Sequence, residues 1–425
     1  MNAGLLVFIL LLLLSFLGIP IFISLGIGTL IALNMADLPM LVLPQKLFAG
    51  MNSSSLLAIP FFILAGNLMS RSITGKLIDV ANALIGRIKG SLALVTVVAS
   101  GLFGAISGSG VATASAIGGL TIPAMKKEGY PAPFAVAVSS ISSILGPIIP
   151  PSITLIVYAS ITNVSVSKLF IGSVIPGLLL VVCLMGYALV YAKRNNLPAH
   201  EKMPAKEVAK TFKSSIWALL MPIIILGGIY GGYVTPTEAA VLSVLYALIY
   251  GFATKEIKVK VLWTVLSKTV LTSAVVTFII SVAKTFGWIL SKTRLPAIIG
   301  EAIMEVIPNK WVYLAVLMAL LFLVGCLMDT IPSILILAPI LVPVGVQFGL
   351  DELHLGVLFC ITLTVGFITP PFGINLFTAV STTGESYTSV VKGVIPFMIV
   401  MIICVLICAF VSPIITFLPG FMMGT

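Results

Sequence analysis

Long apolar runs separated by short polar connections fill most of this chain. A helix needs about 20 apolar residues to cross the hydrocarbon core of a bilayer. The runs are continuous, whereas the strands of a membrane β-barrel alternate apolar and polar residues. The pattern therefore predicts an all-α polytopic membrane protein. Its spans are expected at residues 4–33 (with Pro20 as a kink site), 47–69, 132–162, 169–192, 215–232, 238–253, 261–290, 353–382 and 393–418.

Two further apolar stretches, 91–125 and 311–347, are interrupted near their middles. The interruptions read SGSG (107–110) and MDTIPS (328–333). Each half has about 15 residues, which is fewer than a helix needs to cross the membrane. Short halves joined at a break predict two re-entrant hairpins whose tips reach membrane depth.

Two of the predicted spans contain prolines that break a helix, at ILGPIIPPS (144–152) and at ITPPFGINLF (368–377). Proline lacks the backbone donor and frees the carbonyl one turn back. Such backbone is tolerated at membrane depth only where it is buried in protein or lines a cavity. The freed carbonyls suit a hard cation such as sodium, and the helix N-termini that follow suit an anion.

The charged residues predict which side of the membrane each connection faces. Basic residues flank both ends of the first hairpin, and they fill the loop 193–214 and the connection 255–260, which indicates a cytoplasmic position. Following the spans from there, the second hairpin opens on the outer side, where its flank Asp351–Glu352 is acidic. The N-terminus is then expected in the cytoplasm and the C-terminus in the periplasm.

The two halves of the sequence repeat at an offset of 220 residues. GPIIPPSITLIVYASIT (146–162) aligns with GFITPPFGINLFTAVST (366–382), and the same register pairs Gly129 with Gly349. The charge pattern gives the two copies opposite orientations. Inverted repeats with broken helices near the midplane are typical of secondary transporters.

Composition and motifs exclude several other functions. Hydrophobic residues make up 60% of the chain and charged residues 8%, and the net charge of +10 lies mainly in short loops, so no nucleic-acid partner is expected. The five cysteines lie in apolar runs without a CxxC spacing, which indicates packing. The sequence has no HExxH, GxSxG or phosphate-loop motif, so neither an intramembrane enzyme nor an ATP-driven pump is supported.

Asp329 is the most informative single residue, because an ionisable group in an apolar stretch is costly and by default functional. The alternative is that it caps the second helix of its hairpin. Lys284 lies inside a predicted span and is given no role. Residues 70–90 and 291–310 carry charges at helical spacing, which fits interfacial arm helices or ordinary surface loops.

Five motifs give the chain a family resemblance that runs nearly from end to end. They are PFFILAGNLMS (60–70), SGLFGAISGSGVATASAIG (100–118), IPAMKKEGYP (122–131), ILGPIIPPS and ITPPFGINLF. On these motifs the chain resembles the large membrane subunit (DctM-like) of the tripartite ATP-independent periplasmic (TRAP) transporters. The resemblance implies a sodium-driven importer of organic acids in a bacterial inner membrane, which works with a small four-helix membrane subunit and a periplasmic substrate-binding protein. Because the chain starts with an apolar helix, it resembles the unfused type.

The resemblance also implies an elevator, in which a transport domain slides against a scaffold. Scaffold and arm helices of the first repeat are expected at 1–90, and the first hairpin and first broken helix of the transport domain at 91–162. Scaffold and arm helices with the central cytoplasmic loop would follow at 163–310, the second hairpin and second broken helix at 311–382, and a C-terminal scaffold helix at 383–425.

The implied binding residues fall at the tips and breaks. One sodium site would comprise Ser107, Gly108, Ser109, Gly110, Gly146, Pro147 and Pro150, and the other Asp329, Thr330, Gly366, Thr369 and Pro370. The substrate carboxylate would lie between them, near Thr113, Ser152, Ser333 and Asn375. Because Asp329 stands where the first repeat has Ser109, the two sodium sites are not expected to be chemically equal.

The substrate is less well defined. Members of the resembled family take sialic acid, C4-dicarboxylates and other acids, and this chain is most similar to the sialic-acid members. Sialic acid is therefore the preferred substrate and a C4-dicarboxylate the next. A stand-alone sodium–carboxylate symporter of related fold would share every physical feature described above.

Overall fold

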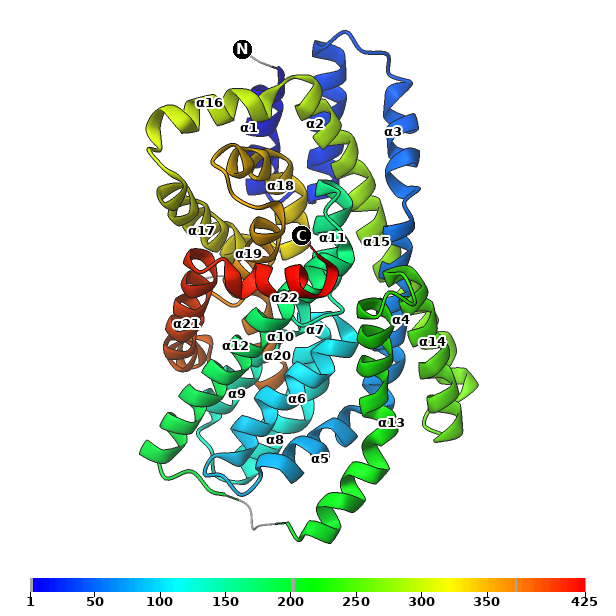
Figure 1. Ribbon diagram of the computed structural model, residues 1–425, viewed down its shortest axis with the longest axis vertical. Coiled ribbons are helices and arrows are strands. Elements are labelled where there is room, and N and C mark those ends of the chain that lie inside the picture. The colour runs from blue at the N-terminus through cyan, green and yellow to red at the C-terminus, as the bar shows by residue number, and fades with distance from the viewer. Residues whose placement is uncertain (1–2, 200–202, 371–372, 425) are drawn as a thin grey trace.

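The computed structural model describes residues 3–199, 203–370 and 373–424, and every regular element in them is helical (Figure 1). Eight of these helices are long and apolar enough to cross a membrane, and a bent pair would add a ninth span. The helices are α1 (Ala3–Phe16), α2 (Ile21–Met35), α3 (Val42–Met51), α4 (Ser54–Ser72), α5 (Thr74–Ile85), α6 (Ser91–Ser107), α7 (Gly110–Thr113), the π-helix η1 (Ala114–Gly118), α8 (Gly119–Lys127), α9 (Ala132–Ser142), α10 (Leu145–Ile148), α11 (Ile153–Thr162), α12 (Val166–Arg194), α13 (Ala205–Tyr230), α14 (Pro236–Ala253), α15 (Val259–Lys292), α16 (Leu295–Val306), α17 (Lys310–Leu327), α18 (Thr330–Gln347), α19 (Glu352–Gly366), α20 (Ile374–Thr383), α21 (Tyr387–Phe410) and α22 (Pro413–Met423).

The first apolar run is a helical hairpin, so the prediction of one span at 4–33 is wrong. Gly18 adopts a left-handed conformation with φ of +80°, and Pro20 then starts α2. The arms pack on each other, because a Cβ on Gly28 would lie 3.1 Å from Cγ1 of Val7. The expected cytoplasmic N-terminus depended on a single crossing here, and the hairpin removes that premise.

The last predicted span, 393–418, is also divided. α21 ends at Phe410, and after a break of two residues α22 starts at Pro413. Proline at the first position of a helix is favourable, because its missing N–H would have no partner there. α22 lies across α12 in Figure 1 and packs against it.

Two other boundaries differ from the expected ones. The predicted span 47–69 comprises α3 and α4, separated at Asn52–Ser53. α13 begins at Ala205, well before the predicted start at 215, so that Lys206 and Lys210 lie on a helix and not in a loop. An apolar window finds only the membrane-embedded part of such a helix, because its polar first turns carry no hydropathy signal.

Both interrupted stretches form two helical arms joined at a short break. In the first, α6 ends at Gly108, which has a left-handed φ of +59°, and the chain turns back through α7, η1 and α8, which pack on α6. In the second, α17 and α18 pack on each other and are joined by Met328 and Asp329 alone. The helix–break–helix organisation of both stretches is therefore present, but α17 and α18 have 18 residues each and are long enough to cross a membrane, so the expectation that both halves are too short is wrong for the second stretch.

The two broken helices are present as well. α9 and α10 are followed by α11 after a non-helical segment at 149–152, with a bend of 41°. Their counterparts in the second repeat are α19 and α20. The 220-residue offset extends to the backbone, since Gly129 (φ +83°) and Gly349 (φ +79°) both adopt the left-handed conformation.

Glycines hold each broken helix against the hairpin of its own repeat. A Cβ on Gly104 of α6 would lie 2.8 Å from the Cα of Gly146, in the first break. In the second repeat a Cβ on Gly366 would lie 2.8 Å from the Cα of Gly325, on α17. Backbones can approach this closely only without side chains, as at other small-residue contacts between membrane helices.

The two repeats run in opposite directions. Lys126 at the end of α8 forms an ion pair with Glu385, which follows α20, at 2.7 Å. The open end of the first hairpin, where α9 begins, therefore coincides with the end of the second broken helix. In agreement, the amphipathic helices α5 and α16 lie at opposite ends of the molecule in Figure 1.

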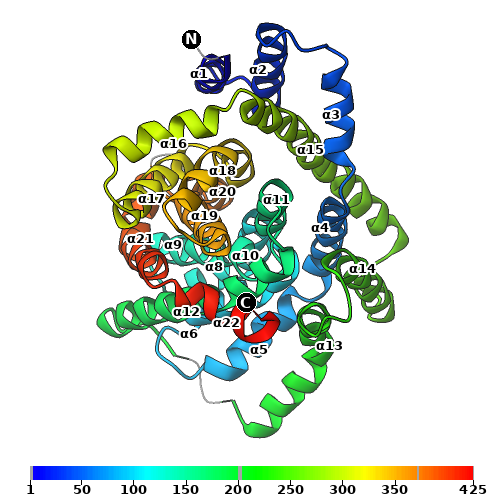
Figure 2. The ribbon, with the colours of Figure 1, turned by 45° about the horizontal axis from the view of Figure 1, so that its top comes forward.

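The helices pack in two groups. α6–α12 and α17–α22 form an inner group that contains both hairpins and both broken helices. α1–α4 and α13–α15 form a curved outer layer, which touches the inner group mainly where α4 meets α6 and α11 and where α15 meets α18 (Figure 2). Within the inner group, α11 packs on α18 of the other repeat, and α20 packs on η1.

The glycine contacts predict a stability effect that depends on position. Gly104→Ala and Gly325→Ala should each lower stability by about 1–3 kcal/mol, because the added methyl group overlaps backbone atoms. Thermal unfolding of the purified protein in detergent measures the change. Gly119→Ala is the control, since nothing lies within 4 Å of its Cβ position. Equal melting temperatures for all three variants would contradict the close contact.

Candidate functional site

Several oxygen atoms lie close together at the tip of the first hairpin. The carbonyl oxygen of Ser109 accepts hydrogen bonds from the N–H of Thr113 at 3.1 Å and from its hydroxyl at 2.8 Å. The hydroxyls of Ser107 and Thr113 are 3.3 Å apart. Ser107 and Thr113 are buried, whereas Ser109 is partly exposed at the tip. The tip thus presents hydroxyl and carbonyl oxygens without a carboxylate.

The first break lies directly against this tip. A Cβ on Gly146 would lie 2.6 Å from the Ser109 carbonyl oxygen and 2.7 Å from Oγ1 of Thr113. A Cβ on Gly108 would likewise lie 2.7 Å from the carbonyl oxygen of Pro151. Any side chain at either glycine would therefore push tip and break apart.

Ser152 closes the first break and starts the helix that follows it. Its buried hydroxyl donates to the carbonyl oxygen of Pro147, which the proline-containing segment leaves free of its helical partner. The same oxygen accepts the N–H of Leu155 at 3.3 Å and so caps α11. One hydroxyl thus stabilises both sides of the break.

Asn375 brings the second repeat into the first site. It lies at the start of α20 and is fully buried, and its Nδ2 donates to Oγ of Ser143 at 3.0 Å. The same nitrogen would lie 2.9 Å from a Cβ on Gly110, at the hairpin tip. Its Oδ1 has no hydrogen-bond partner among the described residues. Asn375 therefore offers a buried acceptor beside the first tip.

The second tip and break are organised differently. Sγ of Cys326 donates to the carbonyl oxygens of Thr369 at 3.3 Å and Pro370 at 3.2 Å. Asp329 is exposed at the tip, and its backbone carbonyl oxygen accepts the hydroxyl of Ser333 at 2.8 Å. Asp329 directly precedes α18, but its carboxylate forms no hydrogen bond that caps this helix, so the structure does not support the capping role allowed for it.

The structure brings the predicted residues of the first site other than Pro150 into contact, but it shows less of the second. The second hairpin approaches the second break at Gly325 and Cys326. The predicted tip residues, Asp329 and Thr330, do not make this contact. Pro371 and Phe372 lie outside the described residues. In contact around the first tip and break are Ser107, Gly108, Ser109, Gly110, Thr113, Gly146, Pro147, Ser152 and Asn375.

Sequence reasoning missed two residues. Ser143 lies directly before the first break, in the run SSISS, and that serine-rich stretch was an available signal. Cys326 was assigned to packing, and nothing in its spacing indicated that its thiol would meet the carbonyls of the second break. No group of three or more His, Cys, Asp or Glu residues that could hold a metal occurs in the described part of the chain.

Comparison with known proteins identifies the family. Residues 7–414 match the family model of the tripartite ATP-independent periplasmic transporter, DctM component. The C4-dicarboxylate TRAP transporter large permease protein DctM of Pseudomonas aeruginosa is 37% identical, with 89% of each chain covered. The sialic acid TRAP transporter large permease protein SiaM of Vibrio cholerae is 35% identical, with 89% of this chain and 90% of the relative covered.

A solved structure supports the fold. The YdaH transporter of Alcanivorax borkumensis superposes with a TM-score of 0.63 at 14% sequence identity, with 88% of each chain covered. The apolar helices described above thus define a polytopic membrane protein. The chain belongs to the DctM family and is the large permease subunit of a TRAP transporter. Its relatives are permeases, which agrees with the expectation that it is not an enzyme.

The hydrogen bonds at the first tip predict the effect of one isosteric change. Thr113→Val should lower stability by about 1–3 kcal/mol, because it leaves the buried hydroxyl of Ser107 without this partner. Thr121→Val is the matched control, since Thr121 is also buried but bonds only the carbonyl oxygen of Ile117 in its own helix. Melting temperatures compare the two. A Thr121 variant destabilised as much as the Thr113 variant would contradict a special role of the tip.

Proposed function

We propose that this permease imports an organic acid coupled to sodium, with one sodium site at each pairing of a hairpin tip and a break. The contact of Gly146 with the Ser109 carbonyl and the Thr113 hydroxyl carries the proposal. It brings the backbone of the first break against two oxygen atoms of the tip, and secondary transporters coordinate sodium with unwound backbone at such breaks.

The two sites would differ in charge. The first offers only neutral oxygens, from Ser107, Ser109, Thr113 and the break at Gly146, Pro147 and Pro150, with Gly108 and Gly110 permitting the approach. The second would add the carboxylate of Asp329 to Thr330, Gly366, Thr369 and Pro370. A carboxylate binds a monovalent cation more strongly than carbonyls alone, because it also neutralises its charge.

An anionic substrate would bind between the two sites. Two helix N-termini follow the breaks, at α11 and α20, and a third follows the second tip, at α18. Such termini carry partial positive charge and unpaired N–H groups that favour a carboxylate. The side chains at these starts, Ser152, Ser333 and Asn375, together with Thr113, are buried and polar, so they are the proposed substrate ligands.

Transport would use an elevator motion of the inner helix group against the outer layer. The packing favours a moving unit that also includes α12, α21 and α22, because these helices pack mainly on α6, α9 and α19, and α12 makes only a minor contact with α13 of the outer layer. This division differs from the one expected from the sequence, which placed residues 163–192 and 383–425 in the scaffold. α5 and α16 would act as arms that connect the two groups.

The proposed partners follow from the family. A small membrane subunit would pack against the outer layer, and a periplasmic binding protein would deliver the substrate. Relatives at similar identity are named for sialic acid and for C4-dicarboxylates. Sialic acid remains the preferred substrate, and a C4-dicarboxylate is the next candidate.

Uptake into proteoliposomes tests the proposal. Radiolabelled sialic acid is offered to vesicles that contain this chain, with and without an inward sodium gradient, the small subunit and the binding protein. Uptake only with all components present is the expected result, and succinate and malate replace sialic acid in a second series. Uptake by this chain alone would favour a stand-alone sodium–carboxylate symporter. No uptake of any acid under a sodium gradient would contradict the proposal.

The charge difference between the sites predicts unequal effects of two substitutions. Asp329→Asn should reduce sodium-dependent uptake about tenfold or more, because the lost charge is worth over 1.4 kcal/mol at such a site. Ser109→Ala should do less, since its backbone carbonyl remains. Glu305→Gln, an exposed change on α16, is the control. Normal uptake by the Asp329 variant, with the same dependence on sodium concentration, would remove Asp329 from the cation site.

A further inference from the structure

Two lysines share one side of the contact between α3 and α15. A Cβ on Gly50 of α3 would lie 3.5 Å from Cβ of Lys284 on α15. One helical turn before Gly50 on α3 and one turn after Lys284 on α15, the two helices meet again. There, Nζ of Lys46 lies 4.7 Å from the ring centroid of Trp288. Residues four apart on a helix lie on one face, so the two lysine side chains start within about one helical turn of each other.

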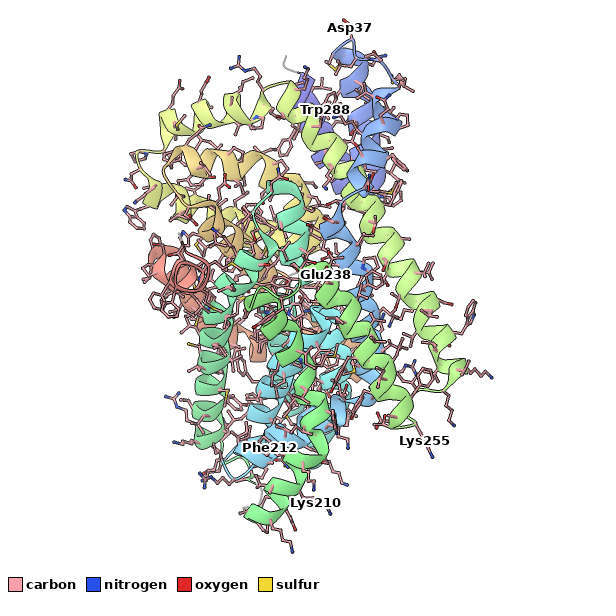
Figure 3. The ribbon with its side chains drawn as sticks, turned by 45° about the vertical axis from the view of Figure 1, so that its right-hand side comes forward. Asp37, Lys210, Phe212, Glu238, Lys255 and Trp288 are labelled. Carbon is pink, nitrogen blue, oxygen red and sulfur yellow. The ribbon has the colours of Figure 1, made fainter. Side chains whose placement is uncertain are left out.

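These ammonium groups have no carboxylate partner in the part of the chain that the structure describes. Among the described residues the one ion pair joins Lys126 and Glu385, at the other end of the molecule. Lys284 and Lys46 are both only partly exposed. Lys284 lies in α15, a candidate membrane span, where a charged group is costly unless it is paired, so an anion bound by Lys284 and the neighbouring Lys46 would lower that cost. Asp37, in the turn between α2 and α3, lies beyond Trp288 at the end of the molecule (Figure 3).

Exposed apolar side chains surround the two lysines. Leu41, directly before α3, is 66% exposed and Phe48 on α3 is 72% exposed, which is expected of a lipid-facing surface. Further basic residues, Lys292 and Arg294, are exposed beyond Trp288 at the same end of α15. An anion that reaches Lys284 from this side must therefore have an apolar part, and an anionic phospholipid combines a charged headgroup with apolar acyl chains.

We propose that Lys46 and Lys284 bind the phosphate headgroup of an anionic phospholipid, with Trp288 beside the upper part of its acyl chains. Tryptophan favours this depth, where one edge of the ring is apolar and the other meets headgroups. Because α15 packs on α18 of the second hairpin, a lipid bound here would contact the outer layer close to the surface on which the inner group moves. The site does not depend on sodium coupling or on the identity of the substrate.

Fluorescence quenching of Trp288 by brominated lipid tests this proposal. A full-length variant with Trp288 as its single tryptophan is made by Trp217→Phe, Trp263→Phe and Trp311→Phe, three positions that are exposed. It is reconstituted into phosphatidylcholine vesicles that contain a small fraction of dibromo-phosphatidylglycerol, or the same fraction of dibromo-phosphatidylcholine. The anionic lipid should occupy the site about fivefold more readily for each lysine. Lys46→Gln and Lys284→Gln together should remove the preference.

The control keeps Trp263 as the single tryptophan, which is 74% exposed near the other end of α15. The lipid preference that Trp263 reports should not change with the two lysine substitutions. If Lys284→Gln fails to fold, Lys46→Gln alone should still lower the preference at Trp288. Equal quenching of Trp288 by both lipids would overturn the proposal, as would a preference that survives both substitutions. A change in Trp288 fluorescence on addition of inorganic phosphate, without any preference for the anionic lipid, would overturn it as well.

Discussion

Backbone N–H and C=O groups that are not hydrogen-bonded cannot face hydrocarbon, and this constraint governs the whole structure. Each broken helix must be covered by protein, and a hairpin from the same repeat does so. Contact close enough to exclude lipid requires glycine on both sides, as at Gly104 with Gly146 and at Gly325 with Gly366. The freed carbonyls then lie inside the protein, where a cation can replace the missing donors.

The inverted repeat produces two pairings of a hairpin with a broken helix, and differences at single positions distinguish the two pairings. Ser109 in the first tip corresponds to Asp329 in the second, so the proposed first site would be neutral and the proposed second site would carry a charge. Asn375 has no polar counterpart, because the register places Leu155 there. Its hydrogen bond to Ser143 fixes the start of α20 beside the first site, so the two repeats share that site.

The sequence predicted the features that local chemistry determines. Prolines and glycines located both breaks and both tips, and the constant offset showed the repeat. It did not predict the turn at Gly18, because an apolar run reads the same through a tight turn as through a span. It also could not show that Asn375 meets Ser143 or that Cys326 meets the second break. Contacts over such separations leave no spacing pattern in either segment.

Sodium binding by the purified protein tests the central claim most directly. The number of ²²Na⁺ ions bound per chain at saturation is measured for the wild type and for Gly146→Ala, after their melting temperatures have shown that both are folded. The account predicts at least two ions for the wild type and one fewer for the variant, because the added methyl group occupies the space beside the Ser109 carbonyl. A single ion in the wild type, or an unchanged number in the variant, would contradict it.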